Sequence, residues 1–301
     1  MTDLYCERVG PGLWAEPLNA ATNLAFFLAA WAAWILGRRA YALSPGVRLL
    51  VTLIIAIGVG STLSHTFATS WARALDTGSI LLFQISYLWL YGRRIANLSP
   101  GLTAGLLTLF VAAAYAGRQF PHVFNGSLIY APAVVVIVGL GVYHARTQSA
   151  ARRALLAAAA VFVLAVVFRV MDRAVCPVFP FGTHFLWHLL IPVALYFLMR
   201  GLLLNTAHAS GGRATFRSSE EFLRAVSDLI ARLEAAGHVG AAAELRDGLR
   251  SITGLTDGAA LFLASVDRVR SGAAAQFAPE DREALAAIRA ASHRVVYGPR
   301  G

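Results

Sequence analysis

Residues 183–204 read THFLWHLLIPVALYFLMRGLLL, a run in which Arg200 is the one charged side chain. At 1.5 Å per helical residue this run extends about 33 Å, enough to cross the hydrocarbon core of a bilayer. Two histidines, His184 and His188, lie in its first turns. The stretch therefore predicts a transmembrane helix that carries polar side chains at one end.

Six further apolar blocks precede this run: Leu18–Leu36, Val47–Ala68, Thr77–Tyr91, Gly101–Gly117, Ser127–Tyr143 and Ala154–Val170. Turn-forming residues separate them, as in Ser44-Pro45-Gly46. The chain is 57% hydrophobic, against about 45–50% in an ordinary soluble domain. We expect an all-α fold: a bundle of seven transmembrane helices at residues 18–204, after an extracytoplasmic N-terminal segment at residues 1–17.

The last hundred residues have a different composition. Residues 205–301 contain twelve Arg and eleven acidic residues, the near balance of a solvated domain. Ser218 and Glu221 form a capping box ahead of a helical pattern. We expect a linker at residues 205–217 and a cytoplasmic, soluble helical tail domain at residues 218–301, which binds a protein partner, self-associates or has a regulatory role.

Arginine placement predicts the orientation. Nine Arg follow the first, third, fifth and seventh apolar blocks, and five lie on the other side of the membrane. Because cytoplasmic loops carry an excess of Arg, the N-terminus is expected outside and the C-terminus in the cytoplasm. The net charge of +10 comes from the membrane half, where it indicates topology and lipid headgroups, not nucleic-acid binding. The chain has no Lys, which excludes a retinal protein because its Schiff base needs a lysine amine.

The acidic residues of the membrane half all fall on the predicted outer face. They are Asp3, Glu7, Glu16, Asp76 and Asp172. Polar groups at membrane depth are costly and tend to mark function. This face is therefore the expected location of a site.

Three histidines are predicted at the same face. His184 and His188 are four residues apart, so they share one side of a helix, and His65 ends the second block. Three imidazoles with an open position suit a catalytic zinc ion. Ser61 lies one turn before His65, and Asp76 lies across a short loop. The alternative is three separate histidines that are merely hydrogen-bonded.

Several short motifs carry a family resemblance. They are Tyr5-Cys6-Glu7, Ala15-Glu16-Pro17-Leu18-Asn19, Thr22-Asn23-Leu24, Gly60-Ser61 with His65, Asp76, and Gly182-Thr183-His184 with Trp187-His188. With these motifs the membrane domain resembles the alkaline ceramidases, which belong to a wider group of seven-helix membrane hydrolases that includes the adiponectin receptors. The resemblance does not extend to the tail.

The resemblance implies a zinc-dependent amidase that cleaves ceramide or a similar N-acyl lipid into a fatty acid and an amine. It implies that His65, His184 and His188 hold zinc. Ser61 and Asp76 would contact the attacking water or the substrate carbonyl.

A receptor or scaffold protein without hydrolytic turnover is the alternative function from another functional class. A transporter is the least favoured function because the charges gather at one face.

The family also has a calcium site in its N-terminal acidic segment. Glu7, Glu16, the Tyr5 carbonyl and Asn19 match it, and oxygen ligands suit calcium. The chain departs from the family at Asp3, which is displaced, and at Val9, which replaces a polar ligand. The alternative is that Glu7 and Glu16 only cap or anchor the segment.

The chain has two cysteines, Cys6 and Cys176, and both are predicted outside. An oxidising compartment favours a disulfide between them over two free thiols, and the family's bridge implies the same pairing.

Overall fold

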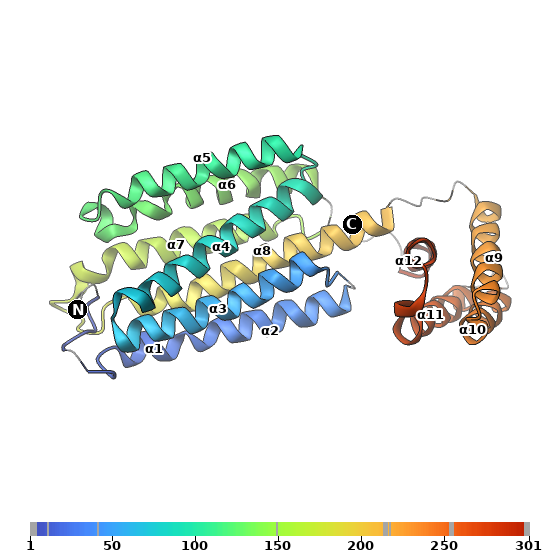
Figure 1. Ribbon diagram of the computed structural model, residues 1–301, viewed down its shortest axis with the longest axis horizontal. Coiled ribbons are helices and arrows are strands. Elements are labelled where there is room, and N and C mark those ends of the chain that lie inside the picture. Colours follow the sequence, from blue (N-terminus) through green and yellow to red (C-terminus); the bar gives the residue numbers. More distant parts are fainter. Residues whose placement is uncertain are drawn as a thin grey trace. The chain divides into compact units, whose positions relative to one another are not determined.

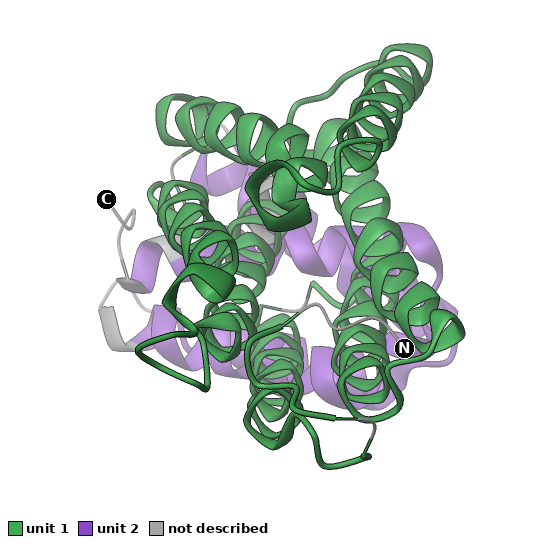
Figure 2. Ribbon diagram, turned by 90° about the vertical axis from the view of Figure 1, so that its left-hand side faces the viewer, with its two compact units in different colours: residues 1–206 green, residues 207–301 purple. Residues whose placement is uncertain are grey.

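The structure, a computed structural model, describes residues 5–10, 12–40, 42–148, 150–212, 216, 218–252 and 256–297, and these ranges contain helices and no strand. The chain divides into two compact units, Met1–Thr206 and Ala207–Gly301 (Figures 1 and 2). The all-α prediction is confirmed.

The first unit is a bundle of long helices that lie side by side (Figure 1). Its elements are α1 (Pro17–Thr22), α2 (Leu24–Arg39), α3 (Pro45–Phe67), α4 (Ser70–Arg94), α5 (Pro100–Arg118), η1 (Val123–Tyr130), α6 (Ala131–Thr147), α7 (Ala154–Val175) and, as far as Thr206, α8 (His184–Gly212). The expected linker at residues 205–217 begins inside α8, and residues 213–215 and 217 lie outside the described residues.

The Ser-Pro-Gly turns start two of these helices. The Ser44 hydroxyl accepts a hydrogen bond from Val47 N, 3.4 Å away, and Ser99 accepts one from Leu102 N at 3.3 Å. Each serine is an N-cap, and the proline that follows sits where its missing N–H leaves no helical bond unmade. The turn residues therefore fix the starts of α3 and α5.

Six helical segments of the described chain are long and apolar enough to cross a membrane. They are Pro17–Arg39, Pro45–Phe67, Pro100–Arg118, Val123–Thr147, Ala154–Val175 and His184–Thr206. They correspond to six of the seven predicted blocks. The remaining block, Thr77–Tyr91, lies within α4, which is not among the six. Its polar residues lower its mean hydropathy.

Helices α3 and α8 are the central helices of the bundle. In the apolar stretch of each helix, 50% is buried in α3 and 56% in α8. The corresponding share is 11% in Val123–Thr147. Leu50 and Ile54 of α3 and Met199 and Leu202 of α8 are fully buried. The two helices that carry the predicted metal ligands are thus the most constrained by packing.

The second unit has its own apolar core. It contains α9 (Ser219–Ala235), α10 (Val239–Arg250), α11 (Thr256–Gly272), η2 (Ala274–Gln276) and α12 (Pro279–Tyr297). Leu229, Leu233, Phe262 and Val266 are buried among these helices. The predicted cap of α9 is present, since the Ser218 hydroxyl accepts from Glu221 N at 3.1 Å.

The turn between α7 and α8 depends on Gly182. Its φ is +64°, and a Cβ there would lie 2.2 Å from Asp172 Oδ1 and 2.5 Å from Cys6 Cβ. Only glycine combines this backbone conformation with such close neighbours. The turn therefore brings α7, the start of α8 and the N-terminal segment into direct contact.

We expect Gly182→Ala to destabilise the protein by about 2 kcal/mol or more, because it adds left-handed backbone strain to a clash with Asp172. The measurement is the thermal melting of purified protein in detergent. Gly139→Ala is the matched control, since a Cβ at Gly139 meets nothing within 4 Å. Equal melting temperatures for the two variants would contradict this account of the turn.

Candidate metal centre

The structure brings the three predicted histidines together. His65 lies in the last turn of α3, and His184 and His188 lie in the first turns of α8, all of them buried. One nitrogen from each ring lies within 4.8 Å of the others. The Nε2 atoms of His184 and His188 are 3.1 Å apart. The three imidazoles therefore converge on one point.

Hydrogen bonds fix the tautomers of two of these rings. His188 Nδ1 is 2.7 Å from the Asn19 carbonyl oxygen, and His65 Nδ1 is 2.5 Å from Glu16 Oε2. A carbonyl oxygen or a carboxylate accepts, so each Nδ1 carries the proton and donates. Each Nε2 then keeps its lone pair. This arrangement is typical of metal-binding histidines.

The ring of His184 is held by stacking. The Tyr5 ring lies over it, with centroids 3.7 Å apart and planes 12° apart. Its Nδ1 is buried and has no hydrogen-bond partner within the part of the chain that the structure describes. The facing Nε2 atoms of His184 and His188 would repel each other if both carried lone pairs, unless a cation lies between them.

The donor set fits zinc. Bonds of 2.0–2.1 Å place two nitrogens of a tetrahedral zinc ion about 3.3 Å apart, close to the 3.1 Å between the two Nε2 atoms. Three imidazoles leave a fourth position open, as catalytic zinc sites do. His65, His184 and His188 are therefore suited to hold a zinc ion.

Glu16 connects the His65 ring to the N-terminal segment. Its carboxylate accepts from His65 Nδ1, from Asn19 Nδ2 at 3.1 Å and from Arg8 Nε. Burial raises the pKa of the Glu16 carboxyl, but the hydrogen bond from His65 and the charge of Arg8 outweigh this effect and leave the pKa below its usual value. Glu16 is thus a charged acceptor that orients the ring.

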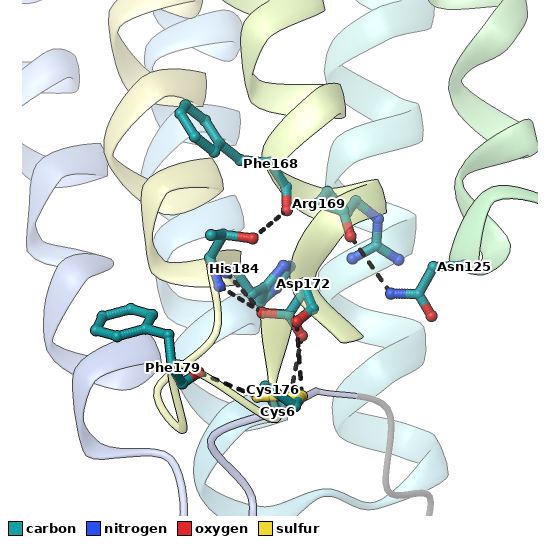
Figure 3. Close-up of a disulfide and its surroundings, with 9 residues drawn as sticks. Cys6, Asn125, Phe168, Arg169, Asp172, Cys176, Phe179 and His184 are labelled. Atoms are coloured by element: carbon teal, nitrogen blue, oxygen red, sulfur yellow. Dashed lines mark hydrogen bonds between the residues drawn. A yellow bond between two sulfur atoms is a disulfide. The ribbon is translucent and has the colours of Figure 1, made fainter. Parts of the chain in front are cut away.

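Asp172 holds the start of α8 (Figure 3). Its Oδ1 accepts from Thr183 N at 2.8 Å and His184 N at 2.9 Å, and its Oδ2 accepts from Cys6 N at 3.0 Å. Asp172 therefore satisfies N–H groups at the N-terminus of the helix that carries two of the histidines.

A disulfide joins Cys6 to Cys176, as the sequence predicts, with their Cα atoms 5.6 Å apart (Figure 3). The Cys6 N–H donates to Asp172, which lies one helical turn before Cys176. The covalent bond and the hydrogen bond therefore attach the N-terminal segment to the same end of α7.

Ser61 and Asp76 lie where α3 and α4 approach each other. Ser61 is buried in α3, one turn before His65. A Cβ on Gly60 would lie 3.0 Å from the backbone N and Cα of Asp76, so α3 and α4 approach closely at this point. The Asp76 backbone therefore packs against the turn of α3 that carries Ser61 and precedes His65.

The residues expected to hold calcium have other partners. The Glu7 carboxylate accepts from Leu18 N at 2.6 Å and from Asn19 N at 2.9 Å, and so caps α1. The Tyr5 carbonyl accepts from Arg8 N at 3.4 Å. Asp3 lies outside the described residues. The described contacts agree with the alternative that Glu7 and Glu16 anchor the segment.

Comparison with known families agrees with this geometry. A family model described as Ceramidase matches residues 5–220, which include every residue of the site. The chain belongs to the ceramidase family. Membership in this family implies an integral membrane hydrolase that cleaves a lipid amide bond. A search of curated proteins finds no match.

One charged side chain that contacts Tyr5 in this ceramidase-family protein was not predicted as a site residue from the sequence. Arg169 Nη1 donates to the Tyr5 hydroxyl at 2.9 Å. Its guanidinium carbon lies 5.4–5.5 Å from the ring centroids of Tyr5, Tyr130 and Trp187. Its Nε is buried without a hydrogen-bond partner among the described residues. A charge at the end of an apolar block was the signal available in the sequence.

We expect Asp172→Asn to destabilise this ceramidase-family protein by about 2–3 kcal/mol, because one buried and two partly buried N–H groups lose a charged acceptor. The loss should appear as a lower melting temperature of the purified protein, together with weaker zinc binding as His184 loses its support. Asp247→Asn is the control, since the Asp247 side chain is 74% exposed. An unchanged melting temperature in Asp172→Asn would show that the cap is dispensable.

Proposed function

We propose that the protein is a zinc-dependent membrane amidase that hydrolyses ceramide or a similar N-acyl lipid to a fatty acid and an amine such as a sphingoid base. The observation that carries this proposal is the convergence of His65, His184 and His188, two of them with Nδ1 held as a donor. Membership in the ceramidase family supports the substrate class.

His65, His184 and His188 would hold the zinc ion. When bound, zinc supplies a Lewis acid and lowers the pKa of water to about 7. The three rings are neutral donors, so the ion keeps its positive charge, which strengthens both effects. The buried position excludes bulk water, which strengthens the electrostatic interactions within the site.

Asp76 and Ser61 act on the reacting groups in this proposal. The oxygen of a water molecule adds to the amide carbon, and Asp76 accepts the proton that the water loses. Asp76 then gives this proton to the nitrogen as the carbon–nitrogen bond breaks, which releases the amine. The Ser61 hydroxyl donates to the carbonyl oxygen as negative charge develops there.

Arg169 provides a further donor. Its Nε–H is directed at no protein acceptor among the described residues, and its neighbours are aromatic rings. A guanidinium without a carboxylate partner attracts an oxygen of the substrate more strongly than a paired one does. We therefore assign it to an oxygen of the lipid head group or of the carbonyl.

Two apolar cavities in the first unit give the acyl chain a path. A cavity of about 90 Å³ is lined by Tyr130 and Trp187, the rings that contact Arg169. A second cavity, of about 670 Å³, lies among α4, α5 and α6. Both are lined by Leu88, Phe110, Val136 and Leu140. The larger volume is within the range of ligand-binding cavities, about 300–1,000 Å³.

We also propose that α4 is a transmembrane helix, which together with the six segments above makes seven. Its 25 residues extend about 37 Å. Phe83, Gln84 and Tyr87 line the smaller cavity, so part of its polar surface faces the interior of the bundle. Trp89 and Leu82 are exposed and suit contact with lipid. A polar face turned inward explains how α4 spans the membrane with a low mean hydropathy.

The orientation is a proposal as well. The disulfide Cys6–Cys176 lies at the end of the bundle that carries the histidines, and disulfides persist in oxidising compartments. Arg38, Arg39, Arg93 and Arg94 lie in the last turns of α2 and α4, which suits the cytoplasmic side. The N-terminus is then extracytoplasmic and the C-terminus cytoplasmic.

We expect His188→Ala to abolish both zinc binding and the release of fatty acid from a fluorescent N-acyl sphingosine, because two imidazoles remain where three are needed. Metal analysis and the lipid assay measure the two effects. The exposed His122→Ala is the control. Full turnover by a zinc-free His188→Ala protein would refute the mechanism, and a wild-type protein that binds zinc without turnover would favour a receptor or scaffold.

We expect Arg169→Met to lower kcat/KM by about 10–100-fold, because a charged hydrogen bond to the substrate is lost. Zinc content should stay at the wild-type level, which separates this effect from collapse of the site. The exposed Arg173→Met serves as the control on the same helix. Unchanged kinetics in Arg169→Met would remove Arg169 from the substrate site.

A further inference from the structure

Arg8 lies buried between the N-terminal segment and the end of α3. Its side chain is 4% exposed. Nε forms an ion pair with Glu16 Oε1, Nη2 donates to the His65 carbonyl oxygen at 2.7 Å, and Nη1 donates to the Gly10 carbonyl oxygen at 3.2 Å. One guanidinium therefore contacts a carboxylate and two carbonyl oxygens, which are the ligand types of a hard metal cation.

These contacts place Arg8 next to His65, one of the proposed zinc ligands. They do not involve the imidazole nitrogens that converge on one point. Arg8 binds one oxygen of Glu16, and the other oxygen of Glu16 accepts from His65 Nδ1. Arg8 also binds the backbone of the same histidine. Both the side chain and the main chain of His65 are thus connected to one buried positive charge.

The residues expected to bind calcium do not fit that ion. Calcium takes six to eight oxygen ligands, whereas both Glu7 oxygens accept backbone N–H groups and both Glu16 oxygens accept from neighbouring donors. Asn19 Oδ1 is a buried oxygen without a partner among the described residues, but one oxygen does not complete such a shell. A calcium ion on Glu16 would also be repelled by the guanidinium already bound there.

We propose that the guanidinium of Arg8 serves as the built-in cation of this segment, in place of calcium, and positions His65 through Glu16. The protein then needs no calcium for its fold or for its zinc site. The proposal rests on the proposed function only in taking His65 as a zinc ligand.

The first experiment measures calcium directly. Purified wild-type protein is dialysed into buffer that contains zinc but no calcium, and calcium chloride is titrated back. We expect no stoichiometric calcium by elemental analysis and no shift of the melting temperature. One calcium ion per chain, with a raised melting temperature, would overturn the proposal.

The second experiment tests the positioning role with Arg8→Met, which keeps an unbranched, flexible side chain and removes its charge. We expect a melting temperature lower by about 10 °C, because Glu16 becomes an uncompensated buried charge. We also expect zinc affinity to fall about 10–100-fold, the usual effect of losing support behind a ligand. Arg173→Met is the matched control, since Arg173 is exposed. If Arg8→Met behaves like this control, the proposal fails.

A double variant separates charge from general damage. Arg8→Met with Glu16→Gln removes both charges, so the double variant should recover part of the melting temperature that Arg8→Met loses, while zinc affinity stays low. Losses that simply add would contradict the pairing. If Arg8→Met does not fold, Arg8→Lys keeps the charge with fewer donors; it should fold, bind no calcium and melt below the wild type, and one calcium ion bound per chain of this variant would overturn the proposal.

These measurements remain informative if the proposed function is wrong. A wild-type protein without zinc and without hydrolysis would refute the amidase proposal. Calcium content and the melting temperatures of the Arg8 variants would still decide whether Arg8 acts as the cation of the N-terminal segment.

Discussion

Two hydrogen bonds behind the histidine rings hold the site together. His65 donates to the Glu16 carboxylate, and His188 donates to the Asn19 carbonyl. Both acceptors lie at the start of α1, whereas the histidines belong to α3 and α8. The direction of each lone pair therefore depends on a short N-terminal stretch, and much of the remaining architecture keeps that stretch in place. Asp172, Arg8 and the disulfide all act in this way.

The long helices and the histidine cluster could be predicted from the sequence for simple reasons. Apolar blocks bounded by Ser-Pro-Gly report local preferences, and the structure starts α3 and α5 at those residues. The spacing of His184 and His188 fixes their common face within one helix. His65 needed one further step, the alternation of helix direction across the membrane. The block within α4 was harder to classify because its polar side chains reduce its hydropathy.

The supporting contacts could not be predicted in the same way. Arg8 and Glu16 are eight residues apart in a segment without regular structure before α1, so no periodicity relates them. Asp172 acts on N–H groups across a turn whose shape depends on Gly182. Arg169 was counted only as a charge on one side of the membrane, although its neighbours are aromatic rings from three separate segments. Such contacts arise from packing between distant segments.

The link between Cys6 and Cys176 has a consequence for how the protein is made. Cys6 emerges from the ribosome early in synthesis, and Cys176 follows it 170 residues later. The covalent closure therefore waits until most of the bundle has been inserted, and α8 follows the second cysteine along the chain. A nascent chain stopped short of α8 would lack two of the three imidazoles, so the chemistry of this protein begins only at the end of its assembly.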